Sequence, residues 1–343
     1  YLVAALGRKD FQLSIITNAE TFLIDIPVET VRTDSVQAFL KQETIFVRIT
    51  TADGNTGVGY SYTIGTGGTA ILAMLRDYLI PKLKGMDSAR VEKVWSEIYY
   101  STRATETGAI TSLAVAAIDT AIWDLKCKRE NQSLAVAAGG FCDRVPLYDT
   151  EGGWLHLSTE ELVAGAVASK KKGWPGVKIK VGKPKMHEDV ERLMAVRQTV
   201  GKDMHIMVDA NTSFTLAEAV KRAKAFEPID LFWLEEPLPA DDVIGHASLA
   251  RSTSIPIAVG ETIYSAMQFQ QYMHQNAVGI VQVDVARVGG ITPWLKVAHM
   301  AESFNLKVCP HFLMEIHVSL AAAIPNGLYV EHIPQLRGVT KSE

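Results

Sequence analysis

Residues 205–237 decide the fold, and they read HIMVDANTSFTLAEAVKRAKAFEPIDLFWLEEP. The stretch opens with the short apolar strand His205–Val208 and closes with a second one, Leu231–Leu234. Between them, Thr215 and Glu218 have the spacing of a capping box, which marks the start of an amphipathic helix. A strand, a helix and a strand in this order predict two parallel strands joined by a right-handed crossover.

The same unit recurs along the chain after Cys142. Eight short apolar segments alternate there with amphipathic helices, and eight parallel strands are the number that closes a β/α barrel. Two more capping boxes, which begin at Ser158 and Ser265, fix helix starts independently of the strands. The expected strands are Val145–Tyr148, Val177–Val181, His205–Val208, Leu231–Leu234, Ile257–Val259, Ile280–Val283, Lys307–Cys309 and Leu328–Val330.

The residues before the barrel follow a different pattern. Three strand-like segments are separated by loops and turns and precede a run of helical periodicity, so we expect a small antiparallel sheet with helices. We therefore divide the chain into an N-terminal α+β domain, residues 1–140, and a barrel domain, residues 141–343. The strands are expected at Phe22–Ile26, Ile45–Ile49 and Gly57–Tyr62, and the helices at Ala70–Leu83, Ser88–Tyr100 and Thr111–Lys128.

Composition and charge exclude several classes of partner. The chain has 34 Lys and Arg against 38 Asp and Glu, and no stretch concentrates basic residues, so we expect no nucleic-acid partner. The longest apolar segment, Ala109–Leu125, contains Asp119 and Asp124 and predicts a core helix rather than a membrane span. The three cysteines are scattered and lack metal-type spacing, which favours a reducing, cytoplasmic location.

Acidic residues stand at the ends of three neighbouring barrel strands. Asp209, Glu235 and Glu261 follow one another at intervals of 26 positions, about one strand-helix unit each. A single carboxylate there is as readily a helix cap, but three at matching depth repel one another unless a cation neutralises them. Oxygen ligands favour Mg²⁺ over zinc. The pattern predicts a magnesium site, from which Glu236 points away because side chains alternate along a strand.

Proton-transfer groups are expected on both sides of this cluster. Lys178 and Lys180 face the same way, and we expect their mutual repulsion to lower the pKa of one or both, so that a neutral amine acts as a base. The bland alternative is a pair of surface lysines. Asp284 and His311 end two adjacent strands opposite, where a carboxylate would orient the imidazole.

These groups suit removal of the weakly acidic proton next to a carboxylate. Removing that proton places charge on the carboxylate oxygens as an enediolate, and a divalent cation with Lys178 and Glu331 would stabilise the charge where it develops. Bases on two faces, Lys180 and His311, allow either configuration to be deprotonated, or let one group act as base and the other as acid.

In combination, the motifs resemble the mandelate racemase subgroup of the enolase superfamily, over about Thr21 to Leu336. The resemblance implies an α/β fold: a modified, enolase-like (β/α)8 TIM barrel with an N-terminal α+β capping domain. The motifs are Lys178-x-Lys180, Asp209-Ala-Asn211, Glu235-Glu236-Pro237, Gly260-Glu261, Asp284 followed by Val288-Gly289-Gly290, Pro310-His311, and Glu331.

Site roles also follow from the resemblance, and they agree with those argued from the residues. It implies one Mg²⁺ per active site, Lys180 as the base for S-type substrates and a substrate carboxylate between Lys178 and Glu331. It also implies that the cap loops Pro27–Ser35 and Tyr62–Gly68 close over the barrel mouth. The magnesium ligands would be Asp209, Glu235 and Glu261, the opposite dyad His311 with Asp284, and further substrate contacts Asn211, Arg32 and Thr63.

Within the subgroup, the chain looks most similar to galactarate and talarate dehydratases. We therefore expect dehydration of an acid sugar, an aldonate or aldarate, to a 2-keto-3-deoxy acid. The alternatives are racemisation or epimerisation of a 2-hydroxy acid at the same site, and a non-catalytic protein that binds sugar acids. We also expect a homo-oligomer, and we expect the barrel domain to lack the C-terminal tail with which this family usually returns to its cap.

Overall fold

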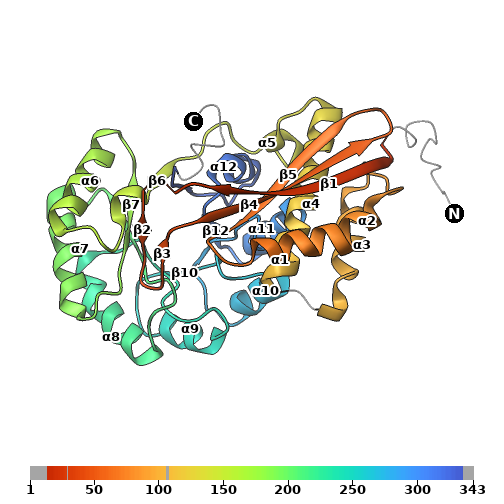
Figure 1. The fold of residues 1–343 in the computed structure, drawn as a ribbon. Helices are drawn as coiled ribbons and strands as arrows, with labels where there is room; N and C mark the ends of the chain where they lie inside the picture. The colour runs from red at the N-terminus through yellow and green to blue at the C-terminus, as the bar shows by residue number, and fades with distance from the viewer. Residues whose placement is uncertain (1–13, 29, 106–107, 335–343) are drawn as a thin grey trace.

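The structure, a computed structural model, describes residues 14–28, 30–105 and 108–334 of the chain. Two parts lie side by side in it (Figure 1): an antiparallel sheet with helices, coloured red to orange, and parallel strands surrounded by helices, coloured mainly green to blue. The predicted fold class is thereby confirmed. The expected outer ends of the two domains, residues 1–13 and 335–343, lie outside the described residues.

The N-terminal sheet is antiparallel, as expected. Its strands follow the order β1 (Ile16–Ile26), β4 (Gln42–Thr51) and β5 (Thr56–Thr63). Alternate residues of β4, such as Val47, are fully buried beneath the long helix α4 (Ala109–Glu130). The helix can approach β5 closely because Gly59 has no side chain: a Cβ there would lie 2.3 Å from the Ala117 carbonyl oxygen. The close approach fixes α4 against the sheet.

The other N-terminal elements include two departures from the expected pattern. The segment 70–83 is not one regular helix but contains a π-helical turn, and the expected loop Pro27–Ser35 contains a short strand that forms a hairpin. The elements are β2 (Arg32–Thr33), β3 (Ala38–Phe39), α1 (Gly68–Met74), the π-helical turn Leu75–Leu79, α2 (Ile80–Leu83), α3 (Val91–Tyr100) and α5 (Leu134–Ala137).

The barrel consists of eight parallel strands, in the order β12-β11-β10-β9-β8-β7-β6-β13. An isolated parallel bridge between Val308 and Gly327 joins the two ends of this order and completes the ring. The strands are β6 (Leu147–Asp149), β7 (Gly176–Lys180), β8 (His205–Asp209), β9 (Trp233–Glu235), β10 (Ile257–Val259), β11 (Ile280–Val281), β12 (Lys307–Val308) and β13 (Val330–His332).

The last strand was expected at Leu328–Val330 and begins two residues later. Leu328 donates to the Val308 carbonyl on one side, whereas Val330 donates to Pro146 on the other, so the ladder with β6 starts only at Val330. Glu331 therefore lies inside the strand, opposite Tyr148, rather than after it. Its side chain is fully buried in the barrel.

The barrel helices begin where the capping boxes predicted. Ser158, Thr215 and Ser265 each accept a hydrogen bond from the backbone N–H three residues later. The helices are α6 (Thr159–Lys171), α7 (Met186–Val200), α8 (Leu216–Phe226), α9 (Val243–Ala250), α10 (Ala266–His274), α11 (Ile291–Ser303) and α12 (Met314–Ala323). In the described part of the chain, no helix combines the length and the apolar character needed to cross a bilayer.

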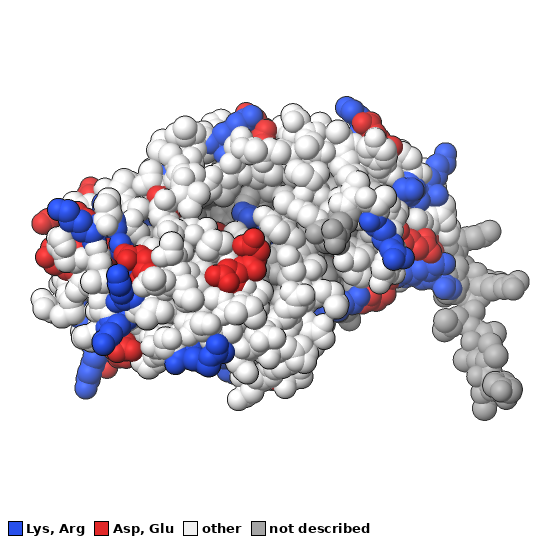
Figure 2. Space-filling model, turned by 90° about the horizontal axis from the view of Figure 1, so that it is seen from below, with Lys and Arg blue, Asp and Glu red and all other residues white. Residues whose placement is uncertain are grey.

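Several hydrogen bonds join the N-terminal part to the barrel. Asp119 of α4 accepts from both the backbone N–H and the hydroxyl of Thr292, at the start of α11. The Tyr62 hydroxyl donates to Asp284 across the same boundary. Figure 2 shows acidic and basic side chains scattered over one face, without a continuous basic patch.

Candidate active site

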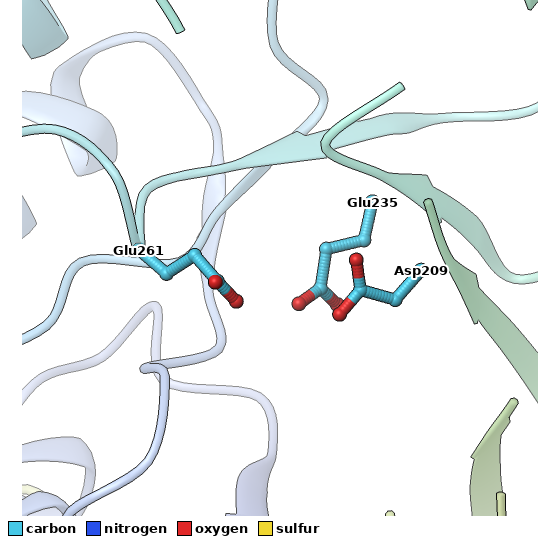
Figure 3. A group of neighbouring side chains, drawn as sticks. All are labelled: Asp209, Glu235 and Glu261. Carbon is cyan, nitrogen blue, oxygen red and sulfur yellow. The ribbon is translucent and has the colours of Figure 1, made fainter. Parts of the chain in front are cut away.

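Three carboxylates converge at one end of the barrel (Figure 3). Asp209 is the last residue of β8, Glu235 is the last residue of β9, and Glu261 follows β10 after Gly260. One oxygen atom of each lies within 4.8 Å of the others. The chain can pass close to the next strand at Gly260 because glycine has no side chain. A Cβ there would lie 2.3 Å from the Gln282 carbonyl oxygen, which is too close. The structure thus brings together the three acidic side chains that the sequence spacing singled out.

This cluster fits a divalent cation. Burial and the charge of Asp209 raise the pKa of Glu235 to about 8, a repulsion that a bound cation would relieve. Trp233 and Gln282 donate to Glu235 Oε2 at 3.0 and 2.6 Å and hold that carboxylate in place. Among the described residues, Glu261 Oε2 is buried without a hydrogen bond. Carboxylate oxygens are the ligands that Mg²⁺ prefers.

Two buried lysines stand at the Asp209 end of the cluster. Lys178 Nζ lies 2.7 Å from Glu235 Oε1 and 2.7 Å from Glu331 Oε1. Lys180 Nζ lies 2.5 Å from Asp209 Oδ2. The expected lowering of the lysine pKa values is wrong for the site as it stands. Burial alone would lower them, but the charges of the neighbouring carboxylates outweigh it and raise both pKa values.

His311 and Asp284 form the opposite end. Nδ1 of His311 lies 2.8 Å from Asp284 Oδ2, and Nε2 lies 3.2 Å from Glu261 Oε2. Because an ionised carboxylate only accepts, Nδ1 is the donor and Nε2 faces the cluster. Burial would lower the pKa of His311, but Glu261 and Asp284 raise it above the usual value. The imidazole is therefore suited to carry and deliver a proton.

A cavity lies at this end of the barrel, and the Lys180 end and the His311 end of the cluster both open into it. Lys180, Glu261 and His311 all line it. Glu331 also lines it and is held by Thr150 and by the Phe312 N–H. A substrate bound in this cavity would therefore meet the carboxylate cluster, Lys180 and His311.

The expected substrate contacts are only partly brought to this cavity. Asn211 lines it, but Arg32 and Thr63 do not. Arg32 instead forms an ion pair with Glu151 at 2.8 Å, and Thr63 donates to Glu43 at 3.0 Å. Asp34 and Tyr62, from the two expected cap loops, also line the cavity, as do two polar side chains that sequence reasoning missed, Gln37 and Arg287.

Family comparisons agree with this geometry. The family "Mandelate racemase / muconate lactonizing enzyme, N-terminal domain" matches residues 15–139, and "Enolase C-terminal domain-like" matches residues 161–341. The chain belongs to the mandelate racemase/muconate lactonizing enzyme family. The resemblance that its motifs indicated is therefore confirmed.

Named relatives in this family act on acid sugars. The chain is 37% identical over 292 residues to L-talarate/galactarate dehydratase from Salmonella typhimurium. The match covers 85% of this chain and 73% of that protein. It is 35% identical over 318 residues to 3,6-anhydro-alpha-L-galactonate cycloisomerase from Streptomyces coelicolor, and the match covers 92% of this chain and 88% of that one. A solved structure of L-talarate dehydratase from Polaromonas sp. JS666, complexed with Mg and L-glucarate, matches with a TM-score of 0.91 and 37% identity. It covers 96% of this chain and 90% of that chain.

In this mandelate racemase/muconate lactonizing enzyme family member, Glu236 lies outside the group of carboxylates that could share one ion. It is buried with a φ of 38°, and its Oε1 accepts from the N–H and the hydroxyl of Thr262. The positive φ ends the alternation directly after β9, which the sequence pattern does not reveal. Burial and the charges of Glu261 and Asp209 raise its pKa.

His317 also has a position that the sequence did not indicate. The ring is fully buried, its Nε2 accepts from the Val285 N–H at 3.0 Å and its Nδ1 donates to Phe312 O at 2.6 Å. Burial lowers its pKa to about 4, so the ring is neutral near pH 7. This histidine joins the segments that directly follow Asp284 and His311, and no spacing in the sequence predicts the link.

Proposed function

We propose that this family member is a Mg²⁺-dependent dehydratase of an acid sugar. It would remove the proton next to the substrate carboxylate, expel the hydroxyl on the next carbon and release a 2-keto-3-deoxy acid. One observation supports this most directly: Lys180 and His311 flank the same carboxylate cluster from opposite ends. Lys180 contacts Asp209 at 2.5 Å, and His311 lies 3.2 Å from Glu261.

Asp209, Glu235 and Glu261 are the residues that would hold Mg²⁺. When bound there, the ion supplies positive charge next to the carboxylate oxygens of the substrate, which makes the neighbouring proton more acidic. Its presence in a solved relative that is 37% identical supports this choice of metal.

Lys178 and Glu331 would lie next to the substrate carboxylate and contact it. Deprotonation moves the electron pair of the C2–H bond into a C1–C2 double bond and leaves negative charge on the carboxylate oxygens. Lys178 is fully buried and already pairs with two carboxylates, Glu235 and Glu331, so its ammonium group is fixed before substrate arrives. A fixed donor stabilises the developing charge without reorganising.

The proton transfers are assigned to the two ends of the site. Lys180 or His311 takes the C2 proton, depending on the substrate configuration. The electron pair then returns to form a C2–C3 double bond as the C3–O bond breaks. His311 is the leading candidate to donate its proton to the departing hydroxyl, which leaves as water. The enol that remains takes up a proton at C3 and becomes the 2-keto acid.

Other outcomes from the same first step are open to the site. A cycloisomerase reaction is a second candidate, because a relative of that name is 35% identical over 92% of the chain. Racemisation or epimerisation would result if the second base returned a proton to C2. A protein that only binds sugar acids would not need Lys180 or the His311–Asp284 pair, so both support an enzyme.

The test is incubation with a panel of acid sugars in deuterated Mg²⁺ buffer. Formation of a 2-keto-3-deoxy product, followed by a colorimetric assay for 2-keto acids and by NMR, would support dehydration. Deuterium at C2 of unchanged or inverted substrate, without keto product, would indicate racemisation, and a cyclic isomer would indicate the cycloisomerase. If no acid sugar reacts or exchanges its C2 proton, the proposal is wrong.

A further inference from the structure

Arg287 is a cation in the wall of the cavity that the proposed reaction does not use. It lies in the loop after β11 and lines the cavity together with Lys180 and His311. Its guanidinium carbon lies 5.6 Å from the centre of the Tyr62 ring and 5.9 Å from that of Tyr264. Nη1 donates a hydrogen bond to the Tyr264 hydroxyl at 3.0 Å. A guanidinium has five N–H donors, so most of its capacity remains for a ligand.

Arg287 is only partly buried and, unlike the buried arginines in the described part of the chain, has no carboxylate in direct contact. Within the described residues, no carboxylate oxygen forms an ion pair with it at 4.0 Å or less. Burial would lower the pKa of the guanidinium, but the charges of Asp284 and Glu261, which act on it only from beyond ion-pair distance, help to raise it. The group therefore stays charged and can pair directly with a carboxylate that enters the cavity. The paired arginines are Arg32 with Glu151, and Arg192 and Arg222 with Asp189.

The backbone that carries Arg287 is held from both parts of the molecule. Asp284, the partner of His311, accepts a hydrogen bond from the Arg287 N–H at 3.1 Å. Ser112 of α4 donates to the Arg287 carbonyl at 2.6 Å and to that of Tyr264 at 3.1 Å. The guanidinium is thus placed before a ligand binds, which lowers the entropic cost of binding.

We propose that Arg287 binds the second carboxylate of a dicarboxylic acid sugar, an aldarate. This inference rests on the proposed function, which places the reacting carboxylate at the Asp209, Glu235 and Glu261 cluster. The planar guanidinium matches the two oxygens of a carboxylate with paired hydrogen bonds, which the terminal hydroxyl of an aldonate cannot reproduce. Arg287 therefore sets a preference for aldarates over the matching aldonates.

The test compares acid sugars that differ only at the terminal carbon, such as galactarate with D-galactonate and D-glucarate with D-gluconate. For the pair that reacts best, kcat/KM should favour the aldarate by on the order of 100-fold. An enzyme that makes keto product equally from both members would overturn this inference and leave the proposed function standing. If neither member of any pair reacts, both ideas fail.

Variants of Arg287 locate the preference. Arg287→Gln should reduce the ratio of kcat/KM for the aldarate to that for the aldonate to near one. Arg287→Lys should keep part of this preference, because the positive charge remains while the paired N–H donors of the guanidinium are lost. Arg251→Gln, at an exposed arginine after α9, is the matched control and should keep the wild-type ratio. If Arg287→Gln keeps the wild-type kcat/KM ratio, another residue recognises the second carboxylate and the inference is wrong. If that variant does not fold, as judged by thermal melting, Arg287→Lys and the wild-type ratio decide.

Discussion

The two ends of the site to which we assign proton transfer are held in different ways. At one end, Lys180 reaches Asp209 directly, and its Nζ lies 5.4 Å from the centre of the Trp154 ring. At the other end, His311 is held by Asp284, and the Tyr62 hydroxyl from the N-terminal part holds Asp284 in turn at 2.8 Å. One end depends on neighbouring charges within the barrel, whereas the other depends on a chain of hydrogen bonds that crosses between the two parts.

This difference has a consequence for substitutions away from the reacting atoms. The Lys180 end should respond mainly to changes in the charge of the cluster. The His311 end should respond also to neutral changes, such as removal of a hydroxyl at Tyr62, because orientation of the imidazole is what that network supplies. The predictions below separate the two ends, from the largest expected effect to the smallest.

Lys180→Ala should have the largest effect. We expect turnover of one C2 configuration to fall by about 10³- to 10⁴-fold, because the base on that face is lost. Deuterium exchange at C2 by His311 should continue for the opposite configuration. The measurement is keto-acid formation and exchange with both epimers of the best acid sugar. Lys221→Ala, at an exposed position on α8, is the control, and full activity of Lys180→Ala on every substrate would disprove the assignment.

Asp284→Asn should weaken the opposite end selectively. The amide preserves the shape but no longer fixes the imidazole as the donor at Nδ1, and it removes the charge that helps to raise the pKa of His311. We expect steps that use His311 to slow by about 100-fold, with less effect on exchange by Lys180. Equal loss at both ends, measured by C2 exchange of the two epimers, would contradict the separation.

Tyr62→Phe removes only the hydroxyl that donates to Asp284 from the N-terminal part. Because a buried carboxylate oxygen then loses one of its donors, we expect steps that use His311 to slow by about tenfold. Steps that use Lys180 should change much less. Thr63→Val, which removes the neighbouring hydroxyl that donates to Glu43, is the matched control. An equal effect of the two variants on the His311 steps would argue against the network.

His317 should give the His311 end a pH-dependent stability. Burial lowers its pKa to about 4 in the folded protein, whereas an unfolded histidine has a pKa near 6.5. The folded state therefore binds fewer protons, so the contribution is complete above pH 6.5 and is lost as the pH falls towards 4. The loss between pH 7 and pH 5 should be about 2 kcal/mol. Urea unfolding should show a weaker pH dependence in His317→Asn, and an unchanged dependence would contradict this cause.

The barrel and the acidic cluster could be predicted because both follow from regular spacing. Each strand-helix unit returns the chain to the same rim, so Asp209, Glu235 and Glu261 at intervals of 26 residues reach the same depth. Capping boxes such as the one at Ser158 fixed the helix starts in the same local way. The His311–Asp284 hydrogen bond could also be anticipated, since the two residues end adjacent strands.

Features that depend on tertiary distances could not be predicted in this way. The pKa values of the lysines rise because carboxylates from other strands lie within hydrogen-bond distance. Glu236 adopts a positive φ that no motif marks. Arg32 pairs with Glu151, 119 positions away, which removes it from the cavity, while Arg287 enters the cavity from a loop that the sequence had assigned no role.

The central claim is that Asp209, Glu235 and Glu261 share one divalent cation between the two proton-transfer ends. The most direct measurement is a Mn²⁺ titration followed by electron paramagnetic resonance, with Mn²⁺ in place of Mg²⁺. We predict one tightly bound ion per chain, with affinity reduced by at least about 100-fold in Asp209→Asn, Glu235→Gln and Glu261→Gln. Glu236→Gln, which changes the carboxylate that faces Thr262, should alter affinity only a few-fold. Undiminished binding in any of the three cluster variants, or no binding by the wild type, would contradict the claim.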